Sequence, residues 1–579
     1  MKAVLAVVLL LGSASSALCQ LSTDQKVIDF QQLAGQYAKQ YAPYEWKRDM
    51  FKVDLLDIKP WLERIQNSKT DLEFYEICSE YVSSLNDVHS EYFTPSTFYA
   101  FIPLAFDIYD GKVLLEQIGR ASLPASRYPF EIGDELVSID GQTPADFIKM
   151  VNHYQAYGNQ RSTDRWSASY LGFMDQSVMP KAPLIGDSAK VIIRRQSTGA
   201  EETYTIPWTK SGRPLINNGP VPSPKGNPVR AYSLVDVNPE ARALSYPRAM
   251  TETFEQYPSY LKHLLRNQRN VRPGRNLRAY GTANPVFTMP AGFVQHRNAY
   301  FYDGVFTAQG KKIAYLRIGD FEPTDFQDLD VPITIFEREI AYLQANSDGL
   351  IVDVMRNPGG FGCYAEELLT RVIPYRFTSF GFELRPTFAD VSAFYDDVDA
   401  ATQDGSPQWV VSLLKNYAKQ VESAYGENRG LTGPLPACTE SFDRDPATDT
   451  RGVNIAYTKP MILLVDEFTT SAADIFAAVF QDAGRGPLVG YRTSGAGGSV
   501  GQVPAGTYGE AFTTITQSLV IRPKAVSTAE FPATRLIENV GVRPDVEVDY
   551  MTRTNLLNGG ADFVSRFTQV IVDQINKTN

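Results

Sequence analysis

The chain has 579 residues, too many for one ordinary hydrophobic core, and its length corresponds to about four domains at roughly 150 residues each. Hydrophobic residues make up 43% and charged residues 21%, as in globular proteins, and the formal net charge is −11. Because phosphate binding needs a positive field, this acidic balance excludes nucleic acid as the expected main partner. With only four histidines and four cysteines, we expect neither a metal nor a cofactor.

Residues 1–19 have the pattern of a secretory signal peptide. Lys2 precedes an apolar run from Ala3 to Leu11, which is too short to cross a bilayer, and small residues then suit cleavage after Ala17 or Cys19. No later segment approaches the ~18 uninterrupted apolar residues of a membrane span. We therefore expect a soluble, secreted protein without a membrane span.

Cleavage after Cys19 leaves three cysteines, Cys78, Cys363 and Cys438, with no CxxC spacing among them. At most one intramolecular disulfide can form, and the odd thiol is expected to be buried. The sequence does not decide which two cysteines pair.

Residues 20–99 are predicted to form a helical domain, because apolar residues recur at three-to-four spacing in two stretches, from Ala34 to Tyr41 and from Leu72 to Leu85. Residues 100–208 instead favour short alternating strands separated by turns. Within them, Ile132–Gly141 contains a turn, a strand and an Asp-Gly turn, and the helical stretch Pro144–Val151 follows. This order resembles a PDZ domain, which binds chain ends by strand addition, although a generic β-hairpin also fits.

Residues 209–298 are predicted to be a linker or a long surface excursion. Five prolines lie between Pro214 and Pro228, and a basic run without acidic residues extends from Lys262 to Arg278. Such a segment buries too little apolar surface to order itself easily. A polyanion-binding patch or a processing site are alternatives for the basic run, and a solvated loop is favoured over the patch.

From residue 299 to the C-terminus, strand and helix patterns alternate. Buried strands are predicted at Ile313–Leu316, Leu350–Val354 and Met461–Val465, and helices at 330–344, 364–373 and 472–481. This alternation predicts an α/β core whose functional site lies beyond the carboxyl ends of the strands.

Two turns follow such strand ends. The first, Arg356–Gly360, contains Gly359 and Gly360, whose backbone N–H groups can face a crevice without a Cβ in the way, although a plain Gly-Gly turn explains them equally. The second, Asp466–Asp474, places Ser471 at the start of a helix, where developing negative charge is favoured. Ser471 and Asp474 also fit a non-catalytic capping box.

The absence of other catalytic and nucleotide-binding motifs excludes several chemistries. The sequence has no HExxH, no GxSxG and no P-loop, and the Gly-rich stretch from Gly495 to Val500 fails the dinucleotide-binding pattern at its last position.

Together the two turns and their strands resemble the tail-specific, or C-terminal-processing, serine proteases, especially the branch of the chlamydial protease-like activity factor and the tricorn core protease. The specific segments are Leu350–Gly360 and Thr470–Ala477, with Gln481–Arg485 following. The resemblance covers most of the chain after the signal peptide. It implies an α/β fold with a crotonase-like protease core in residues 299–579, an N-terminal helical domain and an inserted PDZ-like β domain.

The resemblance also assigns site residues. It makes Ser471 the nucleophile and the N–H groups of Gly359, Gly360 and Ala472 the oxyanion hole. The lysine of the family's main branch falls on Ala496, which cannot accept a proton. In the other branch the base is a histidine in an L-x-D-x-H segment and its partner is a glutamate in an E-N-x-G-V segment, which correspond here to His89 and Glu538.

The resemblance therefore predicts a secreted serine endopeptidase with a Ser-His-Glu triad and protein or peptide substrates. The resemblance leaves open whether the protein forms a homodimer. One alternative is a non-catalytic ligand-binding protein on the same fold, as in interphotoreceptor retinoid-binding protein. Another is a serine–lysine protease whose lysine is displaced, for example to Lys524.

Overall fold

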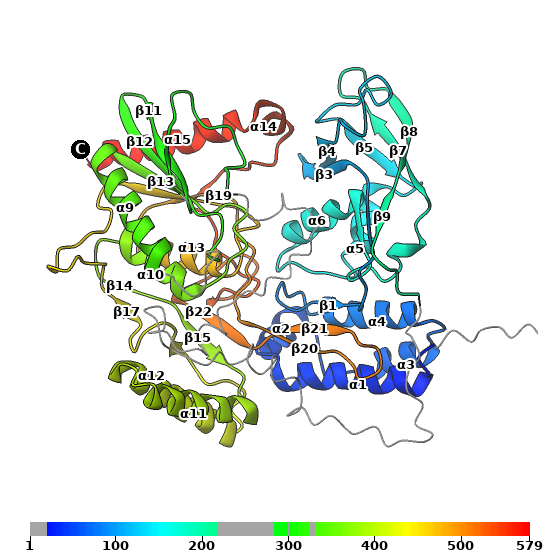
Figure 1. Cartoon of the computed structure of the whole chain (residues 1–579), viewed down its shortest axis with the longest axis horizontal. Helices are drawn as coiled ribbons and strands as arrows, with labels where there is room; N and C mark the ends of the chain where they lie inside the picture. The colour runs from blue at the N-terminus through cyan, green and yellow to red at the C-terminus, as the bar shows by residue number, and fades with distance from the viewer. Residues whose placement is uncertain (1–19, 217–282, 299, 323–329, 579) are drawn as a thin grey trace, which may run out of the picture.

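The computed structural model describes residues 20–216, 283–298, 300–322 and 330–578 (Figure 1). The expected signal peptide and residues 217–282 of the expected linker, including its basic run, lie outside the described residues. Within the described ranges, no helix has both the length and the hydropathy needed to span a bilayer.

The first unit is helical, as the apolar spacing predicts. A capping box formed by Ser22 and Gln25 starts the first helix, and Thr70 caps the fourth. The buried faces meet in a core that contains Phe30, Tyr37 and Tyr81. The four helices are α1 (Thr23–Gln40), α2 (Tyr44–Phe51), α3 (Lys59–Asn67) and α4 (Asp71–Ser83).

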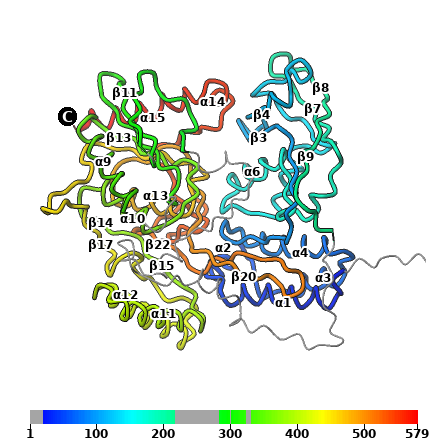
Figure 2. The backbone as a smooth tube through the Cα atoms, viewed as in Figure 1, coloured from blue at the N-terminus to red at the C-terminus, as the bar shows by residue number. Residues whose placement is uncertain are grey.

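A hairpin from the C-terminal half of the chain completes this helical unit. Strands β20 (Val500–Pro504) and β21 (Phe512–Thr516) run beside α1 and α2 in the backbone trace (Figure 2), and β21 pairs with β1 (Tyr92–Phe93). Asp29 of α1 accepts hydrogen bonds from three successive backbone N–H groups at the hairpin tip. The N-terminal unit is thus fixed to the C-terminal half by paired backbone and buried polar contacts.

The second unit contains a five-stranded antiparallel sheet in the order β3-β4-β5-β7-β8. Asp140 and Gly141, in the expected Asp-Gly turn, both have positive φ. A small sheet, β6-β2-β9, lies beside it. The elements are β2 (Tyr99–Phe101), β3 (Leu104–Tyr109), β4 (Lys112–Ile118), β5 (Glu135–Ile139), α5 (Pro144–Val151), α6 (Gln160–Ala168), β6 (Phe173–Asp175), β7 (Ser188–Arg194), β8 (Glu201–Pro207) and β9 (Thr209–Ser211), with short 3₁₀ turns η1 (Ser169–Gly172) and η2 (Ala182–Leu184).

A seven-stranded sheet forms the centre of the third unit, in the order β10-β11-β12-β13-β18-β19-β24. The first three strands are antiparallel, and the pairings from β12 to β24 are parallel. The strands are β10 (Val294–Arg297), β11 (Tyr302–Ala308), β12 (Lys311–Arg317), β13 (Gly349–Asp353), β18 (Met461–Val465), β19 (Leu488–Gly490) and β24 (Val546–Glu547). Two strands, β9 and β10, lie in the stretch expected to be an irregular linker. β9 pairs with the distant β2, whereas β10 pairs with β11, the next strand along the chain.

Helices cover both faces of this sheet, so its central strands are buried throughout. Alternate side chains point to opposite faces: Leu350 and Val352 join a core with α9, α10 and α13, whereas Ile351 faces α15. The helices are α9 (Asp330–Asn346), α10 (Gly362–Val372), α13 (Ala472–Asp482) and α15 (Ala561–Thr578). The parallel β13 and β18 end at the same edge, which brings the two predicted turns together.

The remaining elements extend the core. A disulfide joins Cys363 of α10 to Cys438, and Cys78 is free and buried, as expected for the odd thiol. Burial raises the pKa of the Cys78 thiol far above its usual range, so it is inert. The elements are β14 (Phe377–Thr378), β15 (Gly381–Leu384), α11 (Phe388–Gln403), α12 (Gln408–Gly426), β16 (Leu435–Pro436), β17 (Asp443–Arg444), β22 (Ser518–Val526), β23 (Thr534–Leu536) and α14 (Arg553–Asn558).

Candidate active site

Ser471 lies between β18 and α13 in a backbone conformation that ordinary helix caps do not adopt. Its φ of 59° and ψ of −117° contrast with the extended conformation of Ser22 and Thr70, which cap α1 and α4. A non-glycine residue in this region is strained, and such strain persists only where the surroundings impose it. Ser471 and Asp474 do form the capping box that the sequence allowed, but a cap alone does not account for this backbone conformation.

The Arg356–Gly360 turn packs directly against Ser471. A Cβ added at Gly359 would lie 2.6 Å from Ser471 Cβ and 2.9 Å from the Ala472 nitrogen, and Gly359 has a φ of 96°. The N–H of Thr470 donates to the carbonyl of Asn357, which ties the two turns together. Only glycine allows this approach, so Gly359 is part of the serine's surroundings, whereas a Cβ at Gly360 would meet the backbone of Phe321.

The backbone N–H groups near Ser471 differ in their availability. The Gly359 N–H donates to the side chain of Asn357 at 2.8 Å. Within the described ranges, the N–H groups of Gly360 and Ala472 donate no hydrogen bond. Ala472 is also the first residue of α13, where the helix dipole favours negative charge.

Asp474 connects Ser471 to the loop that carries Ala496. Its carboxylate accepts from the backbone N–H groups of Ser471, Gly495 and Ala496 at 2.9, 3.1 and 3.0 Å. Burial raises the pKa of Asp474 to about 6, although these hydrogen bonds oppose the rise. Ala496, the position at which the main branch of the resembling family has lysine, thus lies beside the serine turn and holds no base.

His89 is buried in the loop after α4. Asp87 accepts from its backbone N–H at 2.8 Å and from the hydroxyl of Thr516 of β21 at 2.7 Å, so the hairpin positions this loop. Within the described part of the chain, neither ring nitrogen of His89 has a hydrogen-bond partner. Burial lowers the pKa of His89 and Lys47 lowers it further, against the opposing charge of Asp87, which favours the neutral imidazole that a general base needs.

Glu538 is fully buried and belongs to the same region. Its Oε1 accepts from Lys47 Nζ at 2.5 Å, and its Oε2 accepts from the Gly497 N–H at 3.2 Å. Burial and the nearby charge of Asp87 raise the pKa of Glu538 to about 7, although Lys47 opposes the rise. Lys47 also donates to the side chain of Asn539.

Ser471 and Glu538 are therefore tied to the same loop, through Asp474 and Gly497, and His89 shares charged neighbours with Glu538, but no hydrogen bond joins the three as a triad within the described residues. Gly497 follows Ala496 and contacts Glu538, while the Asp87 and Lys47 charges act on both Glu538 and His89. Lys47 was not predicted as a site residue, because nothing in the sequence of its helix distinguishes a buried lysine from an exposed one.

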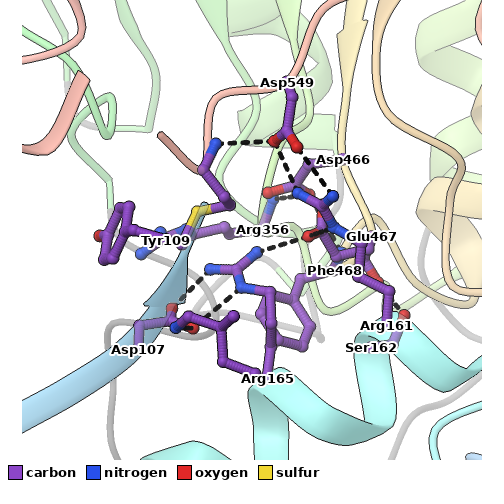
Figure 3. A network of polar contacts seen from close by, with 12 residues as sticks. Asp107, Tyr109, Arg161, Ser162, Arg165, Arg356, Asp466, Glu467, Phe468 and Asp549 are labelled. Carbon is purple, nitrogen blue, oxygen red and sulfur yellow. Dashed lines mark hydrogen bonds and ion pairs between the residues drawn. The ribbon is translucent and has the colours of Figure 1, made fainter. Parts of the chain in front are cut away.

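A polar network joins the second unit to the turn before Ser471 (Figure 3). Arg165 of α6 is buried and lies between Asp107 of β3, with bonds of 3.0 and 2.6 Å, and Glu467, at 2.9 Å. Burial alone would raise the pKa of Glu467, but Arg165 and Arg161 hold it at about 2, so the carboxylate is ionised. Its neighbour Asp466 accepts from the Arg356 N–H at 2.7 Å. The network thus fixes both turns from one side, and no pattern in the sequence indicated it.

The strained serine, the glycine turn and the free N–H groups are the arrangement of a serine hydrolase, and the comparisons make the class more specific. The pattern that defines peptidase family S41 matches residues 312–548. This part of the chain is therefore a peptidase S41 domain, and the protein is a serine peptidase by class.

The similarity to known proteins covers nearly the whole chain. A Chlamydia pneumoniae protein is 25% identical over 602 aligned positions, covering 96% of this chain and 91% of its own. The crystal structure of mature CPAF has a TM-score of 0.73 at 20% identity, covering 96% of this chain and 98% of its own. A structure of mature CPAF complexed with lactacystin has a TM-score of 0.71 at 20% identity, covering 96% and 99% of the two chains. These structures share the fold of this chain.

Proposed function

We propose that this protein is a secreted endopeptidase that cleaves protein or peptide substrates, with Ser471 as nucleophile, His89 as general base and Glu538 as the carboxylate that orients the imidazole. The observation that carries the proposal is the conformation of Ser471 at the start of α13, against Gly359 and beside two unused N–H groups. This geometry suits attack on a carbonyl, whose oxygen becomes negatively charged.

The oxyanion is held by the N–H groups of Gly360 and Ala472 in this proposal. Both are without a hydrogen bond in the described structure, and Ala472 adds the positive end of the helix dipole. The Gly359 N–H is already bonded to Asn357, so the part that we assign to Gly359 is to let the serine approach the turn.

We propose that His89 forms its hydrogen bonds to Ser471 and Glu538 when substrate is bound. Both ring nitrogens lack partners, so no hydrogen bond is lost when the ring turns. Catalytic hydrogen bonds are often loose without substrate and tighten in the reacting complex. His89 then takes the Ser471 proton and returns it to the leaving amine, while ionised Glu538 stabilises the imidazolium.

Two architectural assignments belong to this proposal. We assign residues 100–208 as PDZ-like, supported by the antiparallel sheet with α5 and the Asp-Gly turn, and the S41 domain as crotonase-like, supported by the helix-covered sheet. Export is supported by the signal pattern in residues 1–19 and by the Cys363–Cys438 disulfide, because disulfides persist mainly in oxidising compartments.

A serine-directed phosphonate distinguishes this proposal from the ligand-binding alternative. We expect covalent labelling at Ser471, because the oxyanion hole and the base activate that hydroxyl, and peptide mass spectrometry would locate the adduct. Ser494 is a matched control, since it is buried nearby with an Oγ that has no hydrogen-bond partner among the described residues. Folded, processed protein that remains unlabelled at Ser471 would favour a binder.

The pH profile tests the base and its partner. Burial raises the pKa of Glu538 to about 7, so near pH 6 this carboxyl is still largely protonated, whereas burial lowers the pKa of His89 and favours its neutral form. A protonated carboxyl stabilises the imidazolium poorly, so kcat/KM should rise with pH through a value near 7. In Glu538→Gln this step should disappear and the remaining rate should be lower. A rise centred on a lysine-like pKa above 9 would contradict the assignment.

A further inference from the structure

A second group of ionisable side chains lies at the antiparallel edge of the central sheet, on elements that carry neither the serine nor its glycine turn. His296 of β10 and Asp303 of β11 are register partners, and Glu339 projects from α9. His296 Nδ1 lies 2.5 Å from Glu339 Oε2 and 3.7 Å from Asp303 Oδ2. One donor atom from each residue lies within 4.8 Å of the other two.

The charges of this cluster are poorly balanced by the protein alone. Asp303 is 0% exposed and Glu339 is 4% exposed, and within the described ranges neither carboxylate forms an ion pair with a lysine or an arginine. Asp303 Oδ1 accepts from Asn298 at 2.6 Å, whereas Oδ2 has no hydrogen-bond partner in the described structure. Two buried carboxylates at this distance need a cation or a proton between them.

The donor set and its surroundings suit a metal ion better than a proton. One imidazole nitrogen and two carboxylate oxygens are ligands that zinc accepts, and three protein ligands leave a fourth position for water. The ring of Tyr342 stacks on His296 with centroids 4.1 Å apart, which fixes the imidazole plane. The His296 side chain is 42% exposed, so an ion can reach the buried carboxylates from solvent.

We propose that His296, Asp303 and Glu339 bind one zinc ion, through Nδ1 and one oxygen of each carboxylate. The ion would join β10 and β11 to α9 and so fix the edge of the sheet, a structural part separate from peptide hydrolysis. Asn298 orients Asp303 by its hydrogen bond, as outer groups around metal ligands do. The scarcity of histidine, which led us to expect no metal, says nothing about carboxylates supplied by distant elements.

Metal binding by the full-length processed protein tests this inference directly. After dialysis against a chelator, the protein should take up one equivalent of zinc in a calorimetric titration with zinc chloride, and the melting temperature should rise. His296→Ala should weaken zinc affinity at least 100-fold and remove the rise. His153→Ala, which removes an exposed histidine outside the cluster, is the matched control and should behave as the parent protein.

Asp303→Asn is the second variant, because it keeps the side-chain shape and removes one charge. It should also lose zinc while retaining its circular dichroism spectrum, and phosphonate labelling at Ser471 should be unchanged in all three variants. Zinc uptake equal to the parent protein in both His296→Ala and Asp303→Asn would overturn the proposal, as would a folded parent protein that binds no zinc. Uptake of calcium in preference to zinc would also overturn it.

Discussion

Replacement of Ser471 by alanine is expected to lower kcat/KM for peptide hydrolysis by about 10⁴-fold or more, because no other group can form the acyl-enzyme. The strained backbone comes from the packed turns around it, so the fold should be retained. Ser494→Ala removes a buried hydroxyl from the adjacent loop and should leave hydrolysis near the parent level. The assay is cleavage of an unfolded protein by purified, processed enzyme, with circular dichroism as the folding control.

The two serine variants separate catalysis from simple disturbance of the site. Hydrolysis by Ser471→Ala near the parent rate would contradict the assignment of Ser471 as the nucleophile. An equal loss in Ser471→Ala and Ser494→Ala would point to damage of the loop around Asp474. A large loss confined to Ser471→Ala is the result that the geometry predicts.

Replacement of His89 by alanine has the second largest expected effect, a loss of about 10³- to 10⁴-fold in kcat/KM, because Ser471 then has no base. Lys524→Ala should retain activity, since Lys524 is exposed on β22 and its position offers no support for the displaced-lysine alternative. His153→Ala is the control for loss of a histidine as such. Initial rates for the three variants on one peptide substrate give the comparison.

An inactive Lys524→Ala together with an active His89→Ala would establish the serine–lysine alternative instead. Loss of activity in His89→Ala could also follow from a displaced loop, since Asp87 and Thr516 hold this segment. Phosphonate labelling of His89→Ala separates these effects. A missing base slows labelling at Ser471, and added imidazole should restore part of the labelling rate only if the loop and the serine turn are intact.

In the proposed active site, the N-terminal unit contributes His89 because of how this unit docks. His89 lies in the first unit and Ser471 in the third, and the β20–β21 hairpin joins them through strand pairing and through Asp29. The second unit reaches the serine turn through Arg165 and Glu467. The proposed site would therefore form only when all three units are assembled, since its residues lie hundreds of positions apart in the sequence.

Much of this architecture could be predicted from local patterns. Helix α5 has the predicted limits, Pro144–Val151, and β12, β13 and β18 lie where continuous apolar runs indicated buried strands. Continuous apolar runs predict these strands correctly because a strand covered on both faces must be apolar throughout. The prediction failed at β9 and β10, which were assigned to the linker. β9 is stabilised by β2, a partner that the local sequence does not reveal, whereas β10 pairs with the neighbouring β11 but is mostly exposed and so lacks an apolar pattern.

The sequence by itself determined the chemistry that was available: a serine at a helix start, a glycine turn after a buried strand, an alanine where a lysine would be needed, and one histidine in the fitting segment. Only the tertiary structure decided what those groups contact. It paired Lys47 with Glu538, placed Asp474 between the serine turn and the Ala496 loop, and brought His296 together with two buried carboxylates. The physical reason is that burial and neighbouring charge set the protonation and availability of these groups, and both depend on segments far apart in the chain.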